Sequence, residues 1–121
     1  MTGKSADMTI YHNPSCGTSR KVIGMLRDAG IEPRIVEYLK APPSRTELQI
    51  LLQQMGMTPR QFLRRKGGLF KELGLDDLAT TDDAILDALQ AHPILMERPV
   101  VVSARGTRIC RPAEVVKDLL D

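Results

Sequence analysis

The sequence predicts a four-stranded α/β sandwich, built from a β-α-β unit and a β-β-α unit with a block of helices between them. A strand, an amphipathic helix and a second strand follow one another within residues 8–39. About residues 41–95 then carry their apolar side chains at helical spacing. Strand-type residues return at 99–110 as a hairpin that leads into a last helix. The first pair of strands should be parallel and the hairpin antiparallel, so the sheet should be mixed.

The first unit begins with a strand over Met8–His12, where one face carries Ile10 and His12. Asn13-Pro14-Ser15 predicts a turn. A helix should run from about Gly17 to Ala29 and be capped by Gly30. Its apolar stripe consists of Val22, Ile23, Leu26 and Ala29. Residues 34–39 predict the second strand, which the prolines after it would end.

The middle of the chain carries start and stop signals for several helices. Ser44–Glu47 is a capping box, and Gly56 ends the helix that follows it. A second helix should occupy about 58–66 with a proline in its first turn, and should include Arg64. A short helical turn is expected at 70–73 and a capped helix at 81–92.

The last third of the chain predicts a hairpin and a helix. The strands are expected at Pro99–Ser103 and Arg108–Cys110, with a turn at 104–107. Pro112 should occupy the first turn of the last helix. Its apolar face would consist of Val115, Val116, Leu119 and Leu120.

Composition indicates a single globular domain over all 121 residues, with 42% hydrophobic and 26% charged residues. Residues 1–7 form a polar stretch, expected to be a flexible arm, without the apolar segment of a signal peptide. No apolar run is long enough for a membrane helix, so a cytoplasmic protein is expected. No apolar stripe demands a partner, which favours a monomer.

Charge and aromatic content argue against nucleic-acid binding. The formal net charge is only +2, and the chain has two Tyr, two Phe and no Trp for base stacking. The type of cation is more informative, because 11 of the 17 cationic residues are arginine. The guanidinium group of arginine is well suited to bidentate hydrogen bonding with oxyanions, although most of these side chains are expected to be solvated.

Cys16 is the strongest candidate for chemistry, because it lies between a turn and a helix start. The unpaired N–H groups there stabilise a thiolate, whereas a structural cysteine would have core residues around it. The same groups, at Gly17, Thr18 and Ser19, are suited to an oxyanion. Ser19 stands where a dithiol motif would have its second cysteine. The thiol therefore needs an external thiol or a distant cysteine to resolve a mixed disulfide.

Other candidates have two interpretations each. Cys110 is either that distant cysteine or, as we favour, a buried structural thiol. His12 either lowers the pKa of the thiol or is a half-buried strand histidine. Pro99 opens a strand after either a cis or a trans bond. With two cysteines and two histidines, and no CxxC or HxxxH spacing, a zinc site is not expected.

Several motifs in order resemble one family over about residues 8–120. They are His12–Arg20, Pro42–Arg45, His92–Leu95 with Arg98–Pro99, and Gly106–Pro112. The first closely resembles the active-site loop of the ArsC family of glutaredoxin-coupled arsenate reductases. The resemblance implies a thioredoxin-like fold carrying a helical insertion.

The resemblance also implies roles that spacing does not. The catalytic thiol falls on Cys16, and the neighbouring histidine falls on His12. The oxyanion-binding arginines fall on Arg64, Arg98 and Arg111, and the cis proline falls on Pro99. Without the resemblance, each arginine would be assigned to the solvated surface.

The reaction implied by the resemblance starts with thiolate attack on arsenate to give a Cys–arsenate adduct. Glutathione, a co-substrate rather than a bound cofactor, then attacks arsenic, and glutaredoxin reduces the mixed species to leave arsenite. One alternative is a glutathione-dependent thiol reductase of the same fold with another substrate. A second is an Spx-type regulator that binds RNA polymerase, but many of those use a CxxC switch, and Ser19 argues against one here.

Overall fold

The computed structural model describes residues 8–120, which divide into two units. The first, called the sheet unit, comprises residues 8–41 and 98–120, and the second, called the helical unit, comprises Pro42–Glu97. The predicted flexible arm at residues 1–7 lies outside the described residues.

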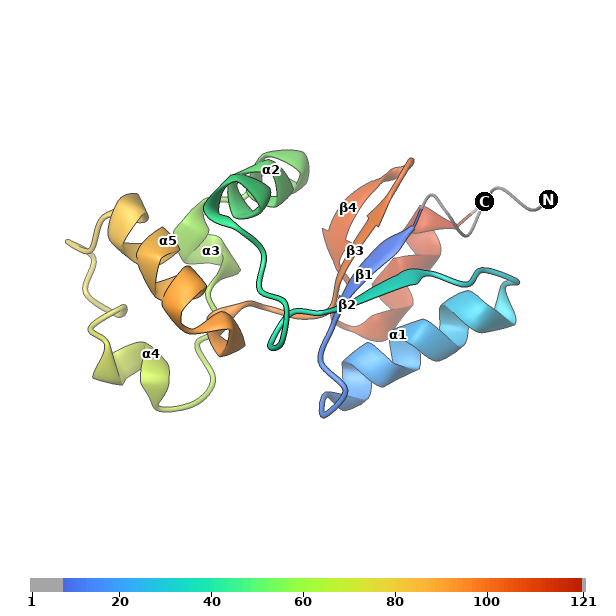
Figure 1. Ribbon diagram of the computed structural model, residues 1–121, viewed down its shortest axis with the longest axis horizontal. Helices are drawn as coiled ribbons and strands as arrows, with labels where there is room; N and C mark the ends of the chain where they lie inside the picture. Colours follow the sequence, from blue (N-terminus) through green and yellow to red (C-terminus); the bar gives the residue numbers. More distant parts are fainter. Residues whose placement is uncertain (1–7, 121) are drawn as a thin grey trace. The chain divides into compact units, whose positions relative to one another are not determined.

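The sheet unit contains four strands in the order β2-β1-β3-β4 (Figure 1). They are β1 (Thr9–His12), β2 (Arg34–Glu37), β3 (Val100–Ser103) and β4 (Gly106–Ile109). β1 pairs in parallel with β2, and β3 is antiparallel to both β1 and β4. The predicted mixed four-stranded α/β fold is therefore confirmed.

One face of this sheet is covered by α1 (Gly17–Asp28) and the 3₁₀ helix η3 (Ala113–Leu119) (Figure 1). Ile10 and Val101 are partners across β1 and β3, and both are fully buried in this core. The predicted helix stripe supplies Val22, Ile23 and Leu26 to the same cluster. Burial of this apolar surface fixes α1, and with it the residues at its start, against the sheet.

Element ends in the sheet unit differ from those expected. β2 stops at Glu37 rather than residue 39, because the Glu37 carbonyl accepts from the N–H groups of Lys40 and Ala41 at 3.0 and 2.9 Å. That turn leads the chain away from β1, so the pairing of β2 with β1 ends at Glu37. β4 begins at Gly106, where φ is +138°, earlier than predicted, and ends at Ile109.

The ends of the two helices of this unit also differ from the prediction. The predicted last helix is a 3₁₀ helix whose buried residues are Ala113, Val116 and Leu119, rather than an α-helix. Ala29, not Gly30, is the cap residue of α1, and Gly30 follows it with φ +81°.

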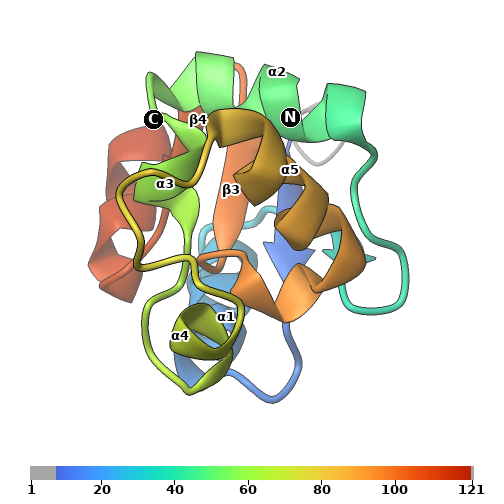
Figure 2. The same cartoon turned by 90° about the vertical axis from the view of Figure 1, so that its left-hand side faces the viewer.

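The helical unit contains five short helices (Figure 2). They are α2 (Arg45–Met55), α3 (Pro59–Phe62), α4 (Leu69–Glu72), α5 (Asp82–Ala91) and the 3₁₀ helix η2 (Pro93–Leu95). α5 packs against α2 and α3. Their buried side chains are Leu48, Leu51, Leu52, Phe62, Ile85, Leu86 and Leu89.

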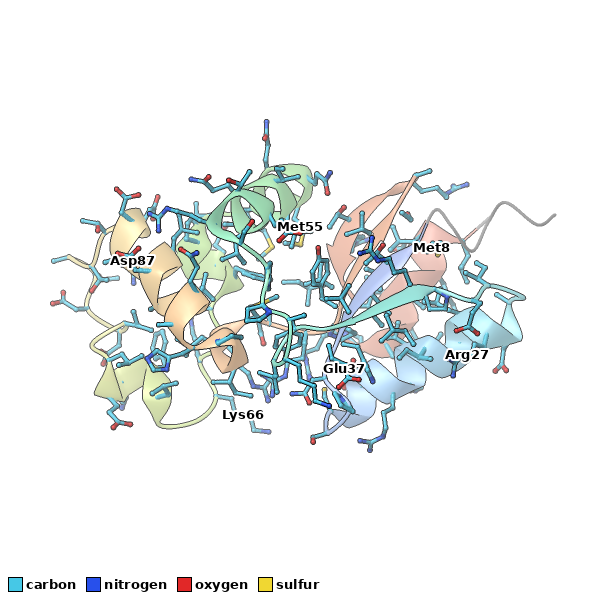
Figure 3. All side chains as sticks on the ribbon, in the orientation of Figure 1. Met8, Arg27, Glu37, Met55, Lys66 and Asp87 are labelled. Atoms are coloured by element: carbon cyan, nitrogen blue, oxygen red, sulfur yellow. The ribbon has the colours of Figure 1, made fainter. Side chains whose placement is uncertain are left out.

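Ion pairs between α2 and α5 reinforce this packing at the surface. Arg45 contacts Asp83 at 3.0 Å and Asp87, labelled in Figure 3, at 2.7 Å. Both carboxylates are well exposed, so these ion pairs contribute little to the free energy of folding.

The segment that carries Arg64 is extended, and the prediction of a helix there is wrong. α3 ends at Phe62, and Leu63 forms an isolated antiparallel bridge with Met96. On either side, the Arg64 N–H donates to the Leu95 carbonyl at 2.7 Å and the Glu97 N–H donates to the Phe62 carbonyl at 3.1 Å. Pairing with a distant segment thus replaces the helical hydrogen bonds that local sequence favoured.

Both hydrogen bonds of the expected capping box of α2 are present, and they lead to a prediction about stability. The Ser44 hydroxyl accepts from the Glu47 N–H at 3.1 Å, and the Glu47 carboxylate accepts from the Ser44 N–H at 2.8 Å. Ser44→Ala should lower the free energy of unfolding by about 1 kcal/mol, measured by urea titration. Thr46→Ala, on the exposed first turn of the same helix, is the matched control. An equal loss in both variants would contradict a specific role for the cap.

Candidate active site around Cys16

Cys16 is the N-cap residue of α1, with extended backbone angles of φ −93° and ψ 118°. Its carbonyl accepts from the Arg20 N–H at 3.0 Å, and its own N–H donates to the Asn13 carbonyl at 2.9 Å. The side chain does not cap the helix, so the sulfur is left for other donors. The backbone N–H groups of Thr18 and Ser19, in the first turn of α1, lower the pKa of the thiol.

Two predicted arginines of the sheet unit meet this sulfur. Arg111 donates through Nη2 to Sγ of Cys16 at 3.3 Å, and through Nε to the Arg98 carbonyl at 3.2 Å. The largely buried Arg98 side chain also donates to the sulfur. The peptide bond between Arg98 and Pro99 is cis, which is the one of the two alternatives that the family resemblance implied. The peptide bond between Arg111 and Pro112 is also cis.

These donors decide the charge on the sulfur. Partial burial raises the pKa of Cys16, but the Ser19 N–H, the Arg98 side chain and the positive charge of Arg111 lower it and together outweigh burial. The net pKa is lowered from its ordinary value. A thiolate at this position is a better nucleophile than an ordinary thiol. The geometry favours the interpretation of a reactive thiol over that of a buried small hydrophobe.

His12 is hydrogen-bonded to Ser19 rather than to the thiol. Its Nδ1 lies 2.5 Å from the Ser19 hydroxyl oxygen, and both side chains are buried. Burial lowers the pKa of His12, the charge of Glu37 (labelled in Figure 3) opposes this, and Arg20 adds to it. The ring is therefore neutral at pH 7. Its influence on Cys16 would pass through Ser19, and its catalytic role stays a prediction.

Cys110 is the buried structural thiol that we favoured from sequence. It is fully buried, and its sulfur lies 3.8 Å from the Arg108 carbonyl oxygen. Burial raises the pKa of Cys110 to about 12, against the opposing charge of Arg108. Both cysteines are free thiols.

The contrast between the two thiols gives a labelling prediction. At pH 7 the native protein should react with one equivalent of iodoacetamide, at Cys16, and the urea-unfolded protein with two. Peptide mass spectrometry of the labelled chain identifies the site. Native labelling of Cys110 at a rate similar to that of Cys16 would contradict its assignment as an inert thiol.

Arg64 belongs to the helical unit, where its Nη1 lies 3.4 Å from the Glu97 carboxylate in a mostly buried pair. Its role in substrate binding stays a prediction. Among residues 8–120, no group of three or more His, Cys, Asp or Glu side chains is placed to hold a metal ion. None of the helices in the described part of the chain is long and apolar enough to span a membrane.

Asn13 is a residue of the site that the sequence indicated only as part of a turn. Its carboxamide oxygen accepts from the Ser15 N–H at 2.9 Å, and its carboxamide nitrogen donates to the Tyr38 hydroxyl at 3.4 Å. Asn13 is only 3% exposed. The available signal was an asparagine two residues before a serine at a helix start, which is the pattern of an Asx-turn.

Comparisons with known proteins assign the chain to one family. The family model described as "ArsC family" matches residues 11–119. An arsenate reductase of Rhizobium meliloti is 58% identical over 113 residues, which cover 93% of this chain and 81% of that protein. One from Escherichia coli is 50% identical over 115 residues, covering 95% and 82%. The solved arsenate reductase from Vibrio cholerae superposes with a TM-score of 0.89 at 43% identity, covering 93% of this chain and 97% of that one. The protein whose Cys16 lies among these donors therefore belongs to the ArsC family.

Proposed function

We propose that the protein is an arsenate reductase in which the Cys16 thiolate attacks arsenate. The observation that carries the proposal is the sulfur at the start of α1, with Nη2 of Arg111 at 3.3 Å and a lowered pKa. The relatives named as arsenate reductases support the substrate. A thiolate surrounded by donors that also suit a tetrahedral oxyanion is what attack on such an anion requires.

In the first step, the thiolate sulfur forms a bond to arsenic, and one hydroxyl of arsenate takes up a proton and leaves as water. Arg98 and Arg111 would hold the oxyanion and offset the charge that develops on its oxygens. The N–H groups at the start of α1 would be further donors. On the resemblance alone, Arg64 is the third cation of this set.

The remaining steps require two electrons from two external thiols. Glutathione sulfur displaces a second hydroxyl, which leaves as water, and binds arsenic beside Cys16. A glutaredoxin thiolate then attacks the glutathione sulfur, forming a disulfide and leaving the electron pair on arsenic, which becomes As(III). Water hydrolyses the sulfur–arsenic bond at Cys16, takes the place of sulfur on arsenic, and releases arsenite and the free thiol. The external thiols are required because Cys110 is buried with a raised pKa.

A coupled assay tests this proposal. NADPH oxidation is followed with glutathione, glutathione reductase and glutaredoxin present, and arsenite is quantified in parallel. We expect one arsenite per NADPH, and no rate when arsenate, glutathione or glutaredoxin is omitted. Turnover of a disulfide substrate without any arsenite would instead indicate a thiol reductase. Copurification with RNA polymerase in the absence of either activity would indicate an Spx-type regulator.

A further inference from the structure

All four polar groups of Asn13, two on the backbone and two on the side chain, form hydrogen bonds. Its backbone N–H donates to the Ser19 hydroxyl at 3.2 Å, and its carbonyl accepts from the Cys16 N–H at 2.9 Å. Its side chain accepts from the Ser15 N–H at 2.9 Å and donates to the Tyr38 hydroxyl at 3.4 Å. These four contacts join the turn after β1 to the first turn of α1 and to Tyr38, the residue that follows β2.

The donors fix the orientation of the Asn13 carboxamide. The Ser15 backbone nitrogen can only donate, so the carboxamide oxygen must face it. The carboxamide nitrogen then faces Tyr38, whose phenol oxygen accepts. Asn13 is 3% exposed and Tyr38 is fully buried, so water cannot replace either partner cheaply. The side chain is therefore held at both ends.

The backbone of Asn13 is also connected to the donors at the sulfur. Its N–H donates to the Ser19 hydroxyl, which is also hydrogen-bonded to Nδ1 of His12. Ser19 is thereby fixed in the first turn of α1, where its own N–H lowers the pKa of Cys16. Cys16 is tied to the same Asn13 through its backbone N–H. Both Cys16 and Ser19 are thus positioned by one residue.

We propose that Asn13, anchored by Tyr38, is a positioning residue that holds Cys16 at the start of α1, where its sulfur contacts Arg111. The inference rests on the proposed role of Cys16 as nucleophile. Asn13 itself need not touch the substrate. Without its side chain the turn at residues 13–15 would lose an internal hydrogen bond and its anchor, and the sulfur would spend less time in contact with its donors.

The test is the rate at which iodoacetamide alkylates Cys16, measured across pH on the full chain. Asn13→Ala should slow alkylation at pH 7 about three- to tenfold and move the pH profile to higher values, because fewer thiols are ionised. Asn13→Ser should recover part of the rate, because a hydroxyl can still accept from the N–H two residues on. Tyr38→Phe, which keeps the buried ring, should give a smaller loss than Asn13→Ala.

A double variant and a control decide between positioning and general destabilisation. If Tyr38 acts through Asn13, Tyr38→Phe should have no further effect in the Asn13→Ala background. Ser44→Ala, which removes a side-chain hydrogen bond at a helix start in the helical unit, should leave the alkylation profile unchanged. Wild-type alkylation rates in Asn13→Ala, or additive effects in the double variant, would overturn the inference. A wild-type profile like that of free cysteine would instead count against the proposed function.

Discussion

Replacing Cys16 by serine should lower arsenate turnover by about a thousandfold or more, to the background of the coupled assay. The serine hydroxyl keeps the position at the start of α1, but it is not ionised at neutral pH and cannot use the donors that stabilise a thiolate. The fold should be unaffected, because the Cys16 side chain does not cap the helix and is only partly buried.

The matched control for this result is Cys110→Ser. That thiol is buried with a pKa raised to about 12, so it should take no part in turnover, and the variant should keep its activity if it folds. Unfolding curves of both variants separate loss of chemistry from loss of structure. Activity near the wild-type level in Cys16→Ser would show that Cys16 is not the nucleophile. A folded but inactive Cys110→Ser would point to a disulfide relay between the two cysteines.

Removing the Arg111 guanidinium should have the next largest effect. Arg111→Ala should lower kcat/KM for arsenate about a hundredfold or more, because one donor to a developing oxyanion is lost. It should also raise the pKa of Cys16, because the charge and the hydrogen bond of Arg111 both favour the thiolate. The thiolate predominates above this pKa and is lost as pH falls through it. The alkylation profile should therefore move to higher pH in the variant.

Two further variants sharpen that prediction. Arg111→Lys keeps the charge but loses the fork that joins the sulfur and the Arg98 carbonyl, so it should fall between wild type and Arg111→Ala. Arg108→Ala, which removes an exposed arginine that pairs with Asp118, is the control. Equal losses in Arg108→Ala and Arg111→Ala would show that net charge, and not the contact at Cys16, governs the reaction.

Local patterns in the sequence were sufficient to predict most elements of the fold. The Ser44 capping box and the hairpin of β3 and β4 depend on residues close together in the chain, and both were correctly predicted. The antiparallel pairing of β1 with β3 joins Ile10 to Val101, and no local pattern encodes it. Likewise, the helix expected at Arg64 gave way to pairing of Leu63 with Met96.

The candidate site was predictable to a similar extent. Cys16 could be identified because its placement at a helix start is a local feature with direct consequences for its pKa. The convergence of Arg98 and Arg111 on its sulfur depends on strand order, so spacing could not show it and the family resemblance supplied it. Asn13 went unnoticed because its partner Tyr38 lies beyond the crossover helix, on a segment that only the parallel pairing of β1 with β2 brings close.

Protection of Cys16 from alkylation tests most directly whether the thiolate and the oxyanion share one site. The iodoacetamide rate at Cys16 is measured at fixed pH and ionic strength, without glutathione, as arsenate replaces chloride. We expect a saturable fall in the rate in wild type and a much weaker one in Arg111→Ala. A rate in wild type that is independent of arsenate concentration up to saturation of the coupled assay would contradict it.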